Sequence, residues 1–286
     1  MITLKNDCLK VDILEKGAEI RSVLGANGTQ FMWDANPDVW AQSAPVMFPV
    51  CGGLRDDKYI LNGKEYTLGK HGFAKLCDFE VIGHTDEKAV FCLRSNEESK
   101  KCFPFDYDFT ITYTLVKNSI YVSYEVLNRG NDTMYFSFGG HEAYACPEGI
   151  EEYSVVFDKN VTLKSLVLNG NLLEYKTNTV LENSNKLDLK EDFFAIDALV
   201  FDKVDFNKAT LVHRNSSKKI TVNFEGFKTF MLWTRPNGAG KYICLEPWCN
   251  APDFVDSDYD FTKKDGVMAL NAYGSLSKTH KITFEE

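Results

Sequence analysis

Apolar and polar residues alternate with a period of two along much of this chain, and that pattern restricts its fold more than any other feature. The alternation is clearest in FTITYTL (109–115), SIYVSYEVL (119–127), KKITVNFEG (218–226) and HKITFEE (280–286). Successive side chains of a β-strand point to opposite faces, so this period predicts strands with one buried face. Lys117 and Asn118 separate the first two runs and predict a β-hairpin. Asn-Gly pairs at 27–28 and 62–63 predict tight hairpin turns, because these residues tolerate a positive φ.

Helical signals are weak, and no segment sustains an apolar stripe over three turns. Residues 169–192 are polar, and we expect a long excursion with short strands there. The abundance of phenylalanine (21) and tyrosine (13) also favours strands over helices. We therefore predict one all-β domain over residues 1–286, a large antiparallel β-sandwich whose sheet curls or stacks to bury its apolar faces.

Charge and cysteine patterns exclude several classes of protein. The net charge is −9 and no lysine- or arginine-rich run occurs, so we expect no nucleic-acid partner. The apolar stretches are short and interrupted by charge, so we expect no membrane partner. Charged residues near the N-terminus interrupt any signal-peptide core, which predicts a cytoplasmic protein. The eight cysteines form no CxxC pair, so zinc-knuckle and redox motifs are absent and we expect reduced, mostly packed thiols.

The chain has only five histidines, and two of them lie beside glycine. His71 occurs in LGKHGFAK and His141 in FGGHEAY, where glycine lets a ligand or another backbone approach closely. A histidine held in a turn explains either pattern equally well. His84, His213 and His280 lie in or near polar turns, and we predict that all three are surface residues.

Three charged residues also lie in unusual surroundings. Glu246 follows the apolar run Ile243-Cys244-Leu245, Asp197 lies within DFFAIDALVFD, and Arg55 follows a Gly-Gly pair. A salt bridge or a surface position remains an alternative for each. The sequence has no G-x-S-x-G elbow, no P-loop and no G-x-G-x-x-G fingerprint. Metal ligands dispersed along the chain remain possible, but HExxH is absent. A histidine and a glutamate without a nucleophile or a cofactor motif suit proton transfer.

Three segments together resemble the aldose 1-epimerase (galactose mutarotase-like) family, and the match is nearest to its LacX-type branch. The segments are FMWDANPDVWAQSAPVMFPVCGGLRDDKYILNGKEYTLGKHGFAK, FSFGGHEAY and YICLEPWCNAPD, and the closing GVMALNAYGSLSKTHKITFE extends the likeness over the chain. The resemblance implies a β-sandwich called a supersandwich, with a sugar cleft on one concave sheet. It implies interconversion of the α and β anomers of an aldose, without a metal or a cofactor.

The resemblance also implies roles for individual residues. Glu246 would be the general base, His141 the general acid, and His71, Arg55 and Asp197 would hold the sugar. The partner would be a monosaccharide, free or phosphorylated, bound by a monomer or homodimer. The family often has asparagine where this chain has Gly140, and glutamine where it has Trp248.

Two alternatives follow from the same resemblance. A hexose-6-phosphate 1-epimerase would need cations for the phosphate, for which Lys58, Lys70 and Lys75 are candidates. A carbohydrate-binding protein of the same fold would bind sugar without turnover, and it would need no acid–base pair.

Overall fold

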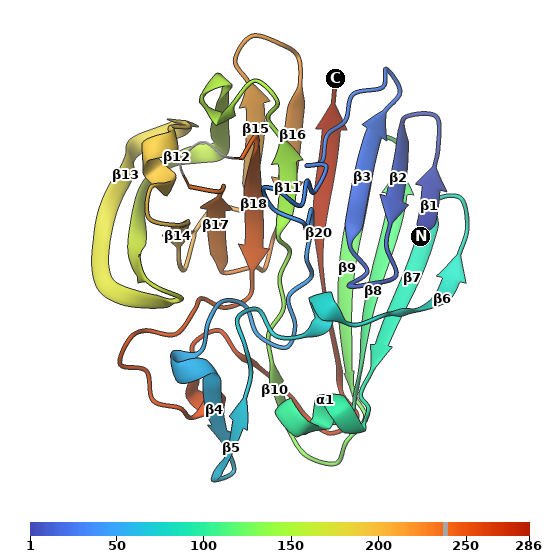
Figure 1. The fold of residues 1–286 in the computed structure, drawn as a ribbon, viewed down its shortest axis with the longest axis vertical. Helices are drawn as coiled ribbons and strands as arrows, with labels where there is room; N and C mark the ends of the chain where they lie inside the picture. Colours follow the sequence, from blue (N-terminus) through green and yellow to red (C-terminus); the bar gives the residue numbers. More distant parts are fainter. Residues whose placement is uncertain (237–239) are drawn as a thin grey trace.

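The computed structural model describes residues 1–236 and 240–286, and strands dominate it (Figure 1). One long antiparallel sheet forms the body of the protein and confirms the predicted all-β class. In order across this sheet, the strands are β11 (Glu142–Ala145), β18 (Tyr242–Trp248), β17 (Thr229–Trp233), β14 (Leu199–Phe201), β12 (Tyr153–Asn169), β15 (Lys208–His213), β16 (Lys219–Asn223), β20 (Ser275–Glu285), β9 (Ser119–Asn128), β8 (Tyr107–Val116), β7 (Lys88–Arg94) and β6 (Glu80–His84). The remaining strand of this sheet, β13 (Leu172–Asp188), is outside this order and pairs with β12.

Smaller elements complete the architecture. The three small sheets are β1 (Ile2–Lys5) with β2 (Leu9–Ile13) and β3 (Ile20–Gly25), β4 (Lys58–Leu61) with β5 (Lys64–Thr67), and β10 (Met134–Phe136) with β19 (Met268–Leu270). The helices are α1 (Glu97–Cys102) and the 3-10 turns η1 (Arg55–Asp57), η2 (Ala74–Leu76), η3 (Ile150–Glu152), η4 (Glu191–Phe194) and η5 (Phe261–Lys263). Within residues 1–236 and 240–286, no helix has the length and hydrophobicity needed to cross a bilayer.

The sheet of β1, β2 and β3 covers one end of the long sheet and gives the sandwich its second layer. Figure 1 shows these strands in front of β7, β8 and β9. The two layers share one apolar cluster, in which Val11 of β2 and Phe91 of β7 are fully buried. The buried Tyr113 hydroxyl of β8 donates a hydrogen bond to the Ala18 carbonyl, 2.7 Å away, just before β3. These contacts confirm the predicted sandwich.

The predicted hairpins form where turn residues accept a positive φ. Lys117 has φ 53° between β8 and β9, which pair along their whole length. Asn62 and Gly63 have φ values of 51° and 77° between β4 and β5. Gly28 has φ 84° after Asn27, close to the end of β3. Local turn chemistry therefore set these hairpins, as the sequence indicates.

The prediction of short strands in residues 169–192 is wrong. β12 and β13 instead form a long curved hairpin that turns at Gly170 and Asn171 (Figure 1). Most side chains of β13 are exposed or half-buried, and its pairing with β12 is interrupted by several register shifts. Because neither face of this strand is fully buried, neither face must be apolar, so the alternation that reveals the other strands is missing here.

The strand β18 divides its side chains between two environments. Ile243 and Leu245 join the main core between the layers. Cys244 and Glu246 point to the opposite face, because the period of a strand is two. Every residue of β18 is buried, so its polar residues are held inside the protein rather than at its surface. This face forms the floor of the cavity described below.

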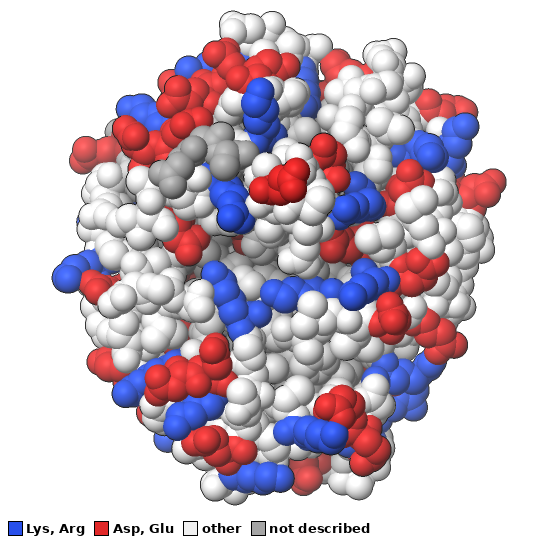
Figure 2. Space-filling model, viewed as in Figure 1, with Lys and Arg blue, Asp and Glu red and all other residues white. Residues whose placement is uncertain are grey.

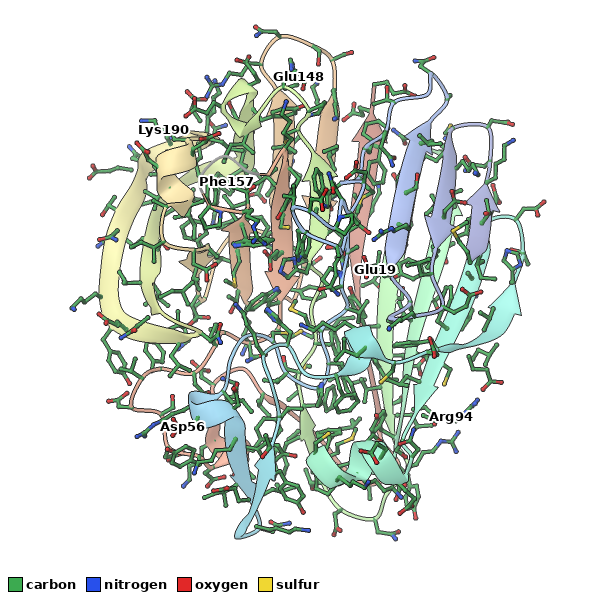
Figure 3. All side chains as sticks on the ribbon, in the orientation of Figure 1. Glu19, Asp56, Arg94, Glu148, Phe157 and Lys190 are labelled. Atoms are coloured by element: carbon green, nitrogen blue, oxygen red, sulfur yellow. The ribbon has the colours of Figure 1, made fainter. Side chains whose placement is uncertain are left out.

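Side chains fill the space between the layers, as Figure 3 shows. Glu19, labelled there, is buried before β3 and accepts hydrogen bonds from the Ser43 amide and hydroxyl. These bonds hold in place the segment around Ser43, whose neighbours Gln42 and Pro45 line the cavity described below. All eight cysteines are within the described residues and are free thiols, five of them buried, as predicted.

Candidate active site

A cavity of about 240 Å³ opens beside β18 and contains four of the five predicted site residues. These four are His71, His141, Asp197 and Glu246. The other lining residues are Trp40, Gln42, Pro45, Met47, Gly52, Lys70, Lys75, Leu168, Asn171, Ala198, Met231, Trp233, Trp248 and Pro252. The lining combines aromatic faces with a few polar groups, as small-molecule sites usually do.

Antiparallel pairing of β11 with β18 brings His141 opposite Glu246. The register pairs Glu142 with Leu245, and an isolated bridge pairs Gly139 with Trp248 in the same register. His141 therefore lies across from Glu246, and its Nε2 is 3.3 Å from Glu246 Oε2. On the other side of β18, Met231 of β17 pairs with Glu246. The acid–base candidates are thus neighbours fixed by the sheet.

Burial pushes both members of this pair toward their neutral forms. Glu246 is 1% exposed, and burial raises the pKa of its carboxyl well above the usual range. Lys70 acts against that increase, whereas the nearby charges of Asp197 and Glu142 add to it. Burial also lowers the pKa of His141 to about 3. The pair therefore favours a state that carries one proton on the carboxyl.

His71 presents a hydrogen-bond donor beside this pair. The Gly52 amide donates to His71 Nδ1 at 3.1 Å, so the neutral ring carries its proton on Nε2. Burial, with smaller effects from His141 and Lys70, lowers the pKa of His71 well below its usual range and keeps the ring neutral. His71 has φ 67°, a conformation that side chains rarely adopt and that occurs more often at functional sites.

The glycines before His141 are required by close packing. A Cβ at Gly139 would lie 2.9 Å from Pro247 O and from Trp248 Cδ1, and a Cβ at Gly140 would lie 2.6 Å from Glu142 Oε2. Gly140 also accepts a hydrogen bond from Trp248 Nε1 at 3.1 Å. The Glu142 carboxylate therefore occupies the space that a side chain at position 140 would need.

Behind this segment, Glu142 pairs with a histidine that we predicted at the surface. His280 of β20 is fully buried, and its Nε2 lies 3.0 Å from Glu142 Oε1. The prediction for His280 is therefore wrong, because its partner is distant in sequence and only the fold brings the two together. His84 is exposed as predicted. His213 is half-buried, with its ring against Tyr153.

Arg55 does not join the other predicted site residues. Its guanidinium donates to Ser257 O at 3.1 Å and lies 5.0 Å from the centre of the Tyr259 ring. Its backbone amide donates to Asp253 Oδ2. Arg55 thus connects two loops near the cavity without lining it. Asp197, in contrast, lines the cavity from the loop before β14.

Aromatic residues that the sequence did not single out form one wall of the cavity. The Trp40 ring lies 5.3 Å from the His141 ring and 5.1 Å from the Trp233 ring, and it stacks on Tyr242 at 5.4 Å. Trp233 shares its face of β17 with Met231, which pairs with Glu246, but only the fold shows this pairing. Trp40 is in a loop, and no pattern in the sequence marked it. Flat apolar faces of this kind can hold the apolar side of a sugar.

Two lysines bring positive charge to the cavity. Lys70 and Lys75 line it on either side of His71, whereas Lys58 pairs with Glu65 at 3.1 Å outside it. Basic side chains gather where the viewed face is hollowed (Figure 2). The site therefore has cations available beside the acid–base pair.

The comparisons with known proteins agree with the fold. The family model for aldose 1-epimerase matches residues 1–268. The chain belongs to the aldose 1-epimerase family.

Similar proteins cover almost the whole chain. Protein LacX (plasmid) of Lactococcus lactis subsp. lactis is 29% identical over 99% of this chain and 98% of its own. A galactose mutarotase related enzyme from Lactobacillus acidophilus has a structure that superposes with a TM-score of 0.95 at 32% identity, covering 99% of this chain and 97% of its own. The structure of a galactose mutarotase-like protein from Lactobacillus casei ATCC 334 superposes with a TM-score of 0.94 at 26% identity, with 99% of both chains covered.

Among the described residues of this aldose 1-epimerase family member, one group of side chains has ligand atoms close enough together for a metal ion. The ligand atoms of His141, Cys244 and Glu246 all lie within 4.8 Å of one another, and all three residues are buried. Cys244 precedes Glu246 by two residues and therefore shares its face of β18. Thiolate, imidazole and carboxylate are the donors that zinc uses in proteins.

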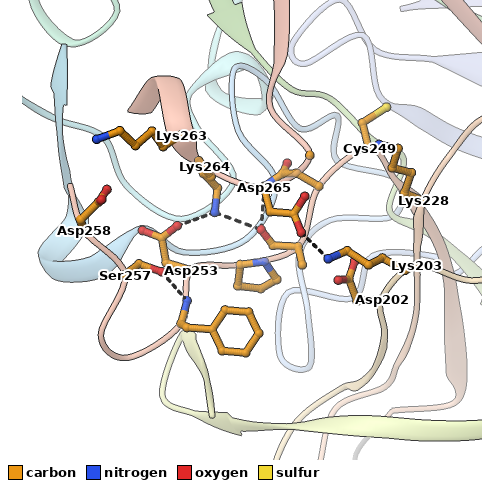
Figure 4. Close-up of a pocket in the computed structure, with 15 residues that line it drawn as sticks. Asp202, Lys203, Lys228, Cys249, Asp253, Ser257, Asp258, Lys263, Lys264 and Asp265 are labelled. Carbon is orange, nitrogen blue, oxygen red and sulfur yellow. Dashed lines mark hydrogen bonds and ion pairs between the residues drawn. The ribbon is translucent and has the colours of Figure 1, made fainter. Parts of the chain in front are cut away.

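A second cavity of about 260 Å³ is lined by none of the five predicted site residues, although Asp253 and Ser257 in its lining contact Arg55 (Figure 4). Its charged groups largely satisfy one another. Lys264 donates to Asp253 Oδ1 and to Ala251 O, and Lys203 pairs with Asp265 at 2.6 Å. Among the described residues that line it, there is no acid–base pair comparable to His141 and Glu246, so the first cavity is the candidate active site.

We predict that Gly139→Ala destabilises this family member by about 1–3 kcal/mol, because the new methyl group overpacks against Trp248 and Met47. Gly69→Ala is the matched control, since a Cβ there meets nothing within 4 Å. Urea denaturation measures both. Equal unfolding free energies for the two variants would contradict the packing argument.

We also predict that Glu246→Gln stabilises the protein increasingly as pH rises. The folded-state pKa of Glu246 is raised, so above its unfolded value, near 4.3, folding requires the carboxyl to retain a proton that the unfolded chain releases. This penalty grows by up to about 1.4 kcal/mol per pH unit until the folded pKa is reached. Glutamine removes this penalty, so the increase in the free energy of unfolding should be small at pH 4.5 and larger at pH 7. Denaturation at both pH values is the measurement, with exposed Glu225→Gln as a control expected to show no such trend.

Proposed function

We propose that this protein is an aldose 1-epimerase that interconverts the α and β anomers of a monosaccharide by acid–base catalysis. The observation that carries the proposal is the buried pair of His141 Nε2 and Glu246 Oε2, 3.3 Å apart at the floor of a cavity of sugar size. Proton transfer needs such a pair, whereas binding alone does not.

In the proposed reaction the pair carries one proton throughout. The Glu246 carboxylate takes the proton of the anomeric hydroxyl, and the His141 imidazolium gives its proton to the ring oxygen. The C1–O bond of the ring breaks as the C1 carbonyl forms, which leaves the open-chain aldehyde. Rotation about C1–C2 and the reverse transfers close the ring on the other face and restore both groups.

The reaction begins from the ion pair, which forms when the carboxyl proton of the resting pair moves to His141, and the electrostatics of the site favour the transfers that follow. Ring opening converts the ion pair of Glu246 and His141 into a neutral pair, which is the state that burial favours. The raised pKa of Glu246 makes it a stronger base than an exposed carboxylate once it is ionised. Mutarotation proceeds unaided in water, so a contribution of ~10²–10⁴-fold from positioned acid and base groups is enough for an effective enzyme.

Other cavity residues would position the sugar. His71 would donate from Nε2 to a sugar oxygen, and Asp197 would accept from a sugar hydroxyl. Trp40 and Trp233 would pack on the apolar face of the ring. We assign no sugar contact to Arg55, because its guanidinium already binds Ser257 O and the Tyr259 ring.

A second candidate function is the same reaction on a phosphorylated aldose. The observation that favours it is the presence of Lys70 and Lys75 in the cavity lining. Their charges lower the pKa values of both His71 and His141, which indicates that they act close to the reacting groups. An anionic substrate would compensate these charges.

We expect Glu246→Gln and His141→Asn each to lower the rate of anomer exchange by ~10²–10⁴-fold, because each removes one proton-transfer group. NMR exchange spectroscopy or polarimetry on freshly dissolved α-sugars measures the rate. Exposed His84→Asn should leave it unchanged. Wild-type rates in both site variants would exclude the mechanism. Saturable sugar binding without any wild-type acceleration would instead identify a carbohydrate-binding protein.

Rates on glucose and on glucose 6-phosphate separate the two candidate substrates. If the substrate is phosphorylated, Lys75→Met should raise KM for the phosphosugar by tenfold or more and change KM for free glucose much less, because a charge-assisted contact is worth ~1.5–3 kcal/mol. Lys64→Met, at an exposed position on β5, is the control. No preference of the wild type for the phosphosugar would exclude the second candidate.

A further inference from the structure

Cys244 has a thiol that the proposed acid–base reaction does not use, although it lies directly beside the reacting groups. It is fully buried, among Trp33, Ala143 and Tyr242. Packing alone would explain a small apolar residue at this position. A thiol within 4.8 Å of both an imidazole nitrogen and a carboxylate oxygen is also placed to share a metal ion with them.

The distances suit a metal of the size of zinc. Zn²⁺ binds nitrogen, oxygen and sulfur at about 2.0–2.3 Å, so tetrahedral geometry places neighbouring ligand atoms about 3.3–3.6 Å apart. His141 Nε2 and Glu246 Oε2 are already 3.3 Å apart. The Cys244 sulfur lies within 4.8 Å of both atoms, and metal binding would require it to approach to ligand distance.

The oxygen ligands have no competing hydrogen bonds from the described residues, and a cation must displace the protons that burial keeps on Glu246 and on Cys244. Neither carboxylate oxygen of Glu246 has a hydrogen-bond partner within the described part of the chain, although both are buried. A cation would satisfy these oxygens. His141 and Glu246 line the cavity, so a fourth ligand, water or a sugar oxygen, could reach the metal from there. Of the charged groups that face Glu246, Asp197 and Glu142 favour a cation and Lys70 opposes it.

We propose that His141, Cys244 and Glu246 form a reversible binding site for a thiophilic divalent cation such as Zn²⁺, which blocks the acid–base pair when it binds. A resident metal is not what this site is built for. Histidines that hold zinc usually donate from their other ring nitrogen to a partner, and His141 Nδ1 has none among residues 1–236 and 240–286. The site therefore acts as an inhibitory one. The inhibition rests on the proposed function, whereas metal binding does not.

Metal binding is tested first, without any sugar. Co²⁺ is added to metal-free wild type under reducing conditions, and a thiolate-to-cobalt charge-transfer band with one equivalent bound is expected. Cys244→Ala should lose the band and bind Zn²⁺ at least tenfold more weakly by calorimetry. That variant retains the half-buried thiols of Cys8, Cys77 and Cys102, so binding by those residues would persist in it.

Cys146→Ala is the matched control, because Cys146 is equally buried but does not belong to the cluster. It should keep the band. Cys244→Ser preserves the side-chain volume and replaces the alanine variant if that one fails to fold. Absence of the band in wild type, or an equal band in the Cys244 variant, would overturn the proposal.

Inhibition is then measured on anomer exchange. Zn²⁺ should slow the wild type, chelator should restore it, and Cys244→Ala should need at least tenfold more Zn²⁺ for the same inhibition. Equal inhibition of both proteins would overturn the inhibitory role. Because the cobalt band is measured without substrate, the test of metal binding remains valid even if the wild type proves to have no epimerase activity.

Discussion

The pairing of β11 with β18 is the constraint on which the candidate site depends. It places His141 across from Glu246, and it holds a carboxylate inside the protein at the end of an apolar strand. A buried carboxylate without a hydrogen bond from any described residue costs free energy, which must be offset by the apolar side chains on the other face of the same strand. Ile243 and Leu245 supply that anchoring, because they lie in the main core. The strand thus carries the stabilising and the destabilising residues together.

Close packing around the Gly-Gly pair extends this constraint to the segment before His141. Trp248 closes on Gly139 from one side, and Glu142, itself held by His280, closes on Gly140 from the other. The chain therefore approaches His141 along a path with no room for side chains. A backbone fixed on both sides leaves the imidazole little freedom to move away from Glu246, which suits a group that must be prepositioned for proton transfer.

The sequence predicted what depends on local chemistry and missed what depends on distant neighbours. The hairpin at Lys117 follows from alternation and turn residues alone, and His141 and Glu246 were identifiable from glycine neighbours and from a charge in an apolar run. β13 was missed because a strand that is exposed on both faces has no alternating pattern. His280 and Arg55 were misplaced because their partners, Glu142 and Ser257, are more than a hundred residues away in the sequence.

The cavity divides its residues between rigid and adaptable elements, and this division has a functional consequence. His141, Glu246 and Met231 are fixed by strand register, whereas Lys70 and Asp197 project from loops. Loops accept substitutions and insertions at low cost, but a change of strand register would move every side chain to the opposite face. Within such a fold the proposed reaction can therefore be retained while the preferred sugar changes. Differences in substrate should accordingly be sought at the positions of Lys70, Lys75 and Asp197 rather than in the acid–base pair.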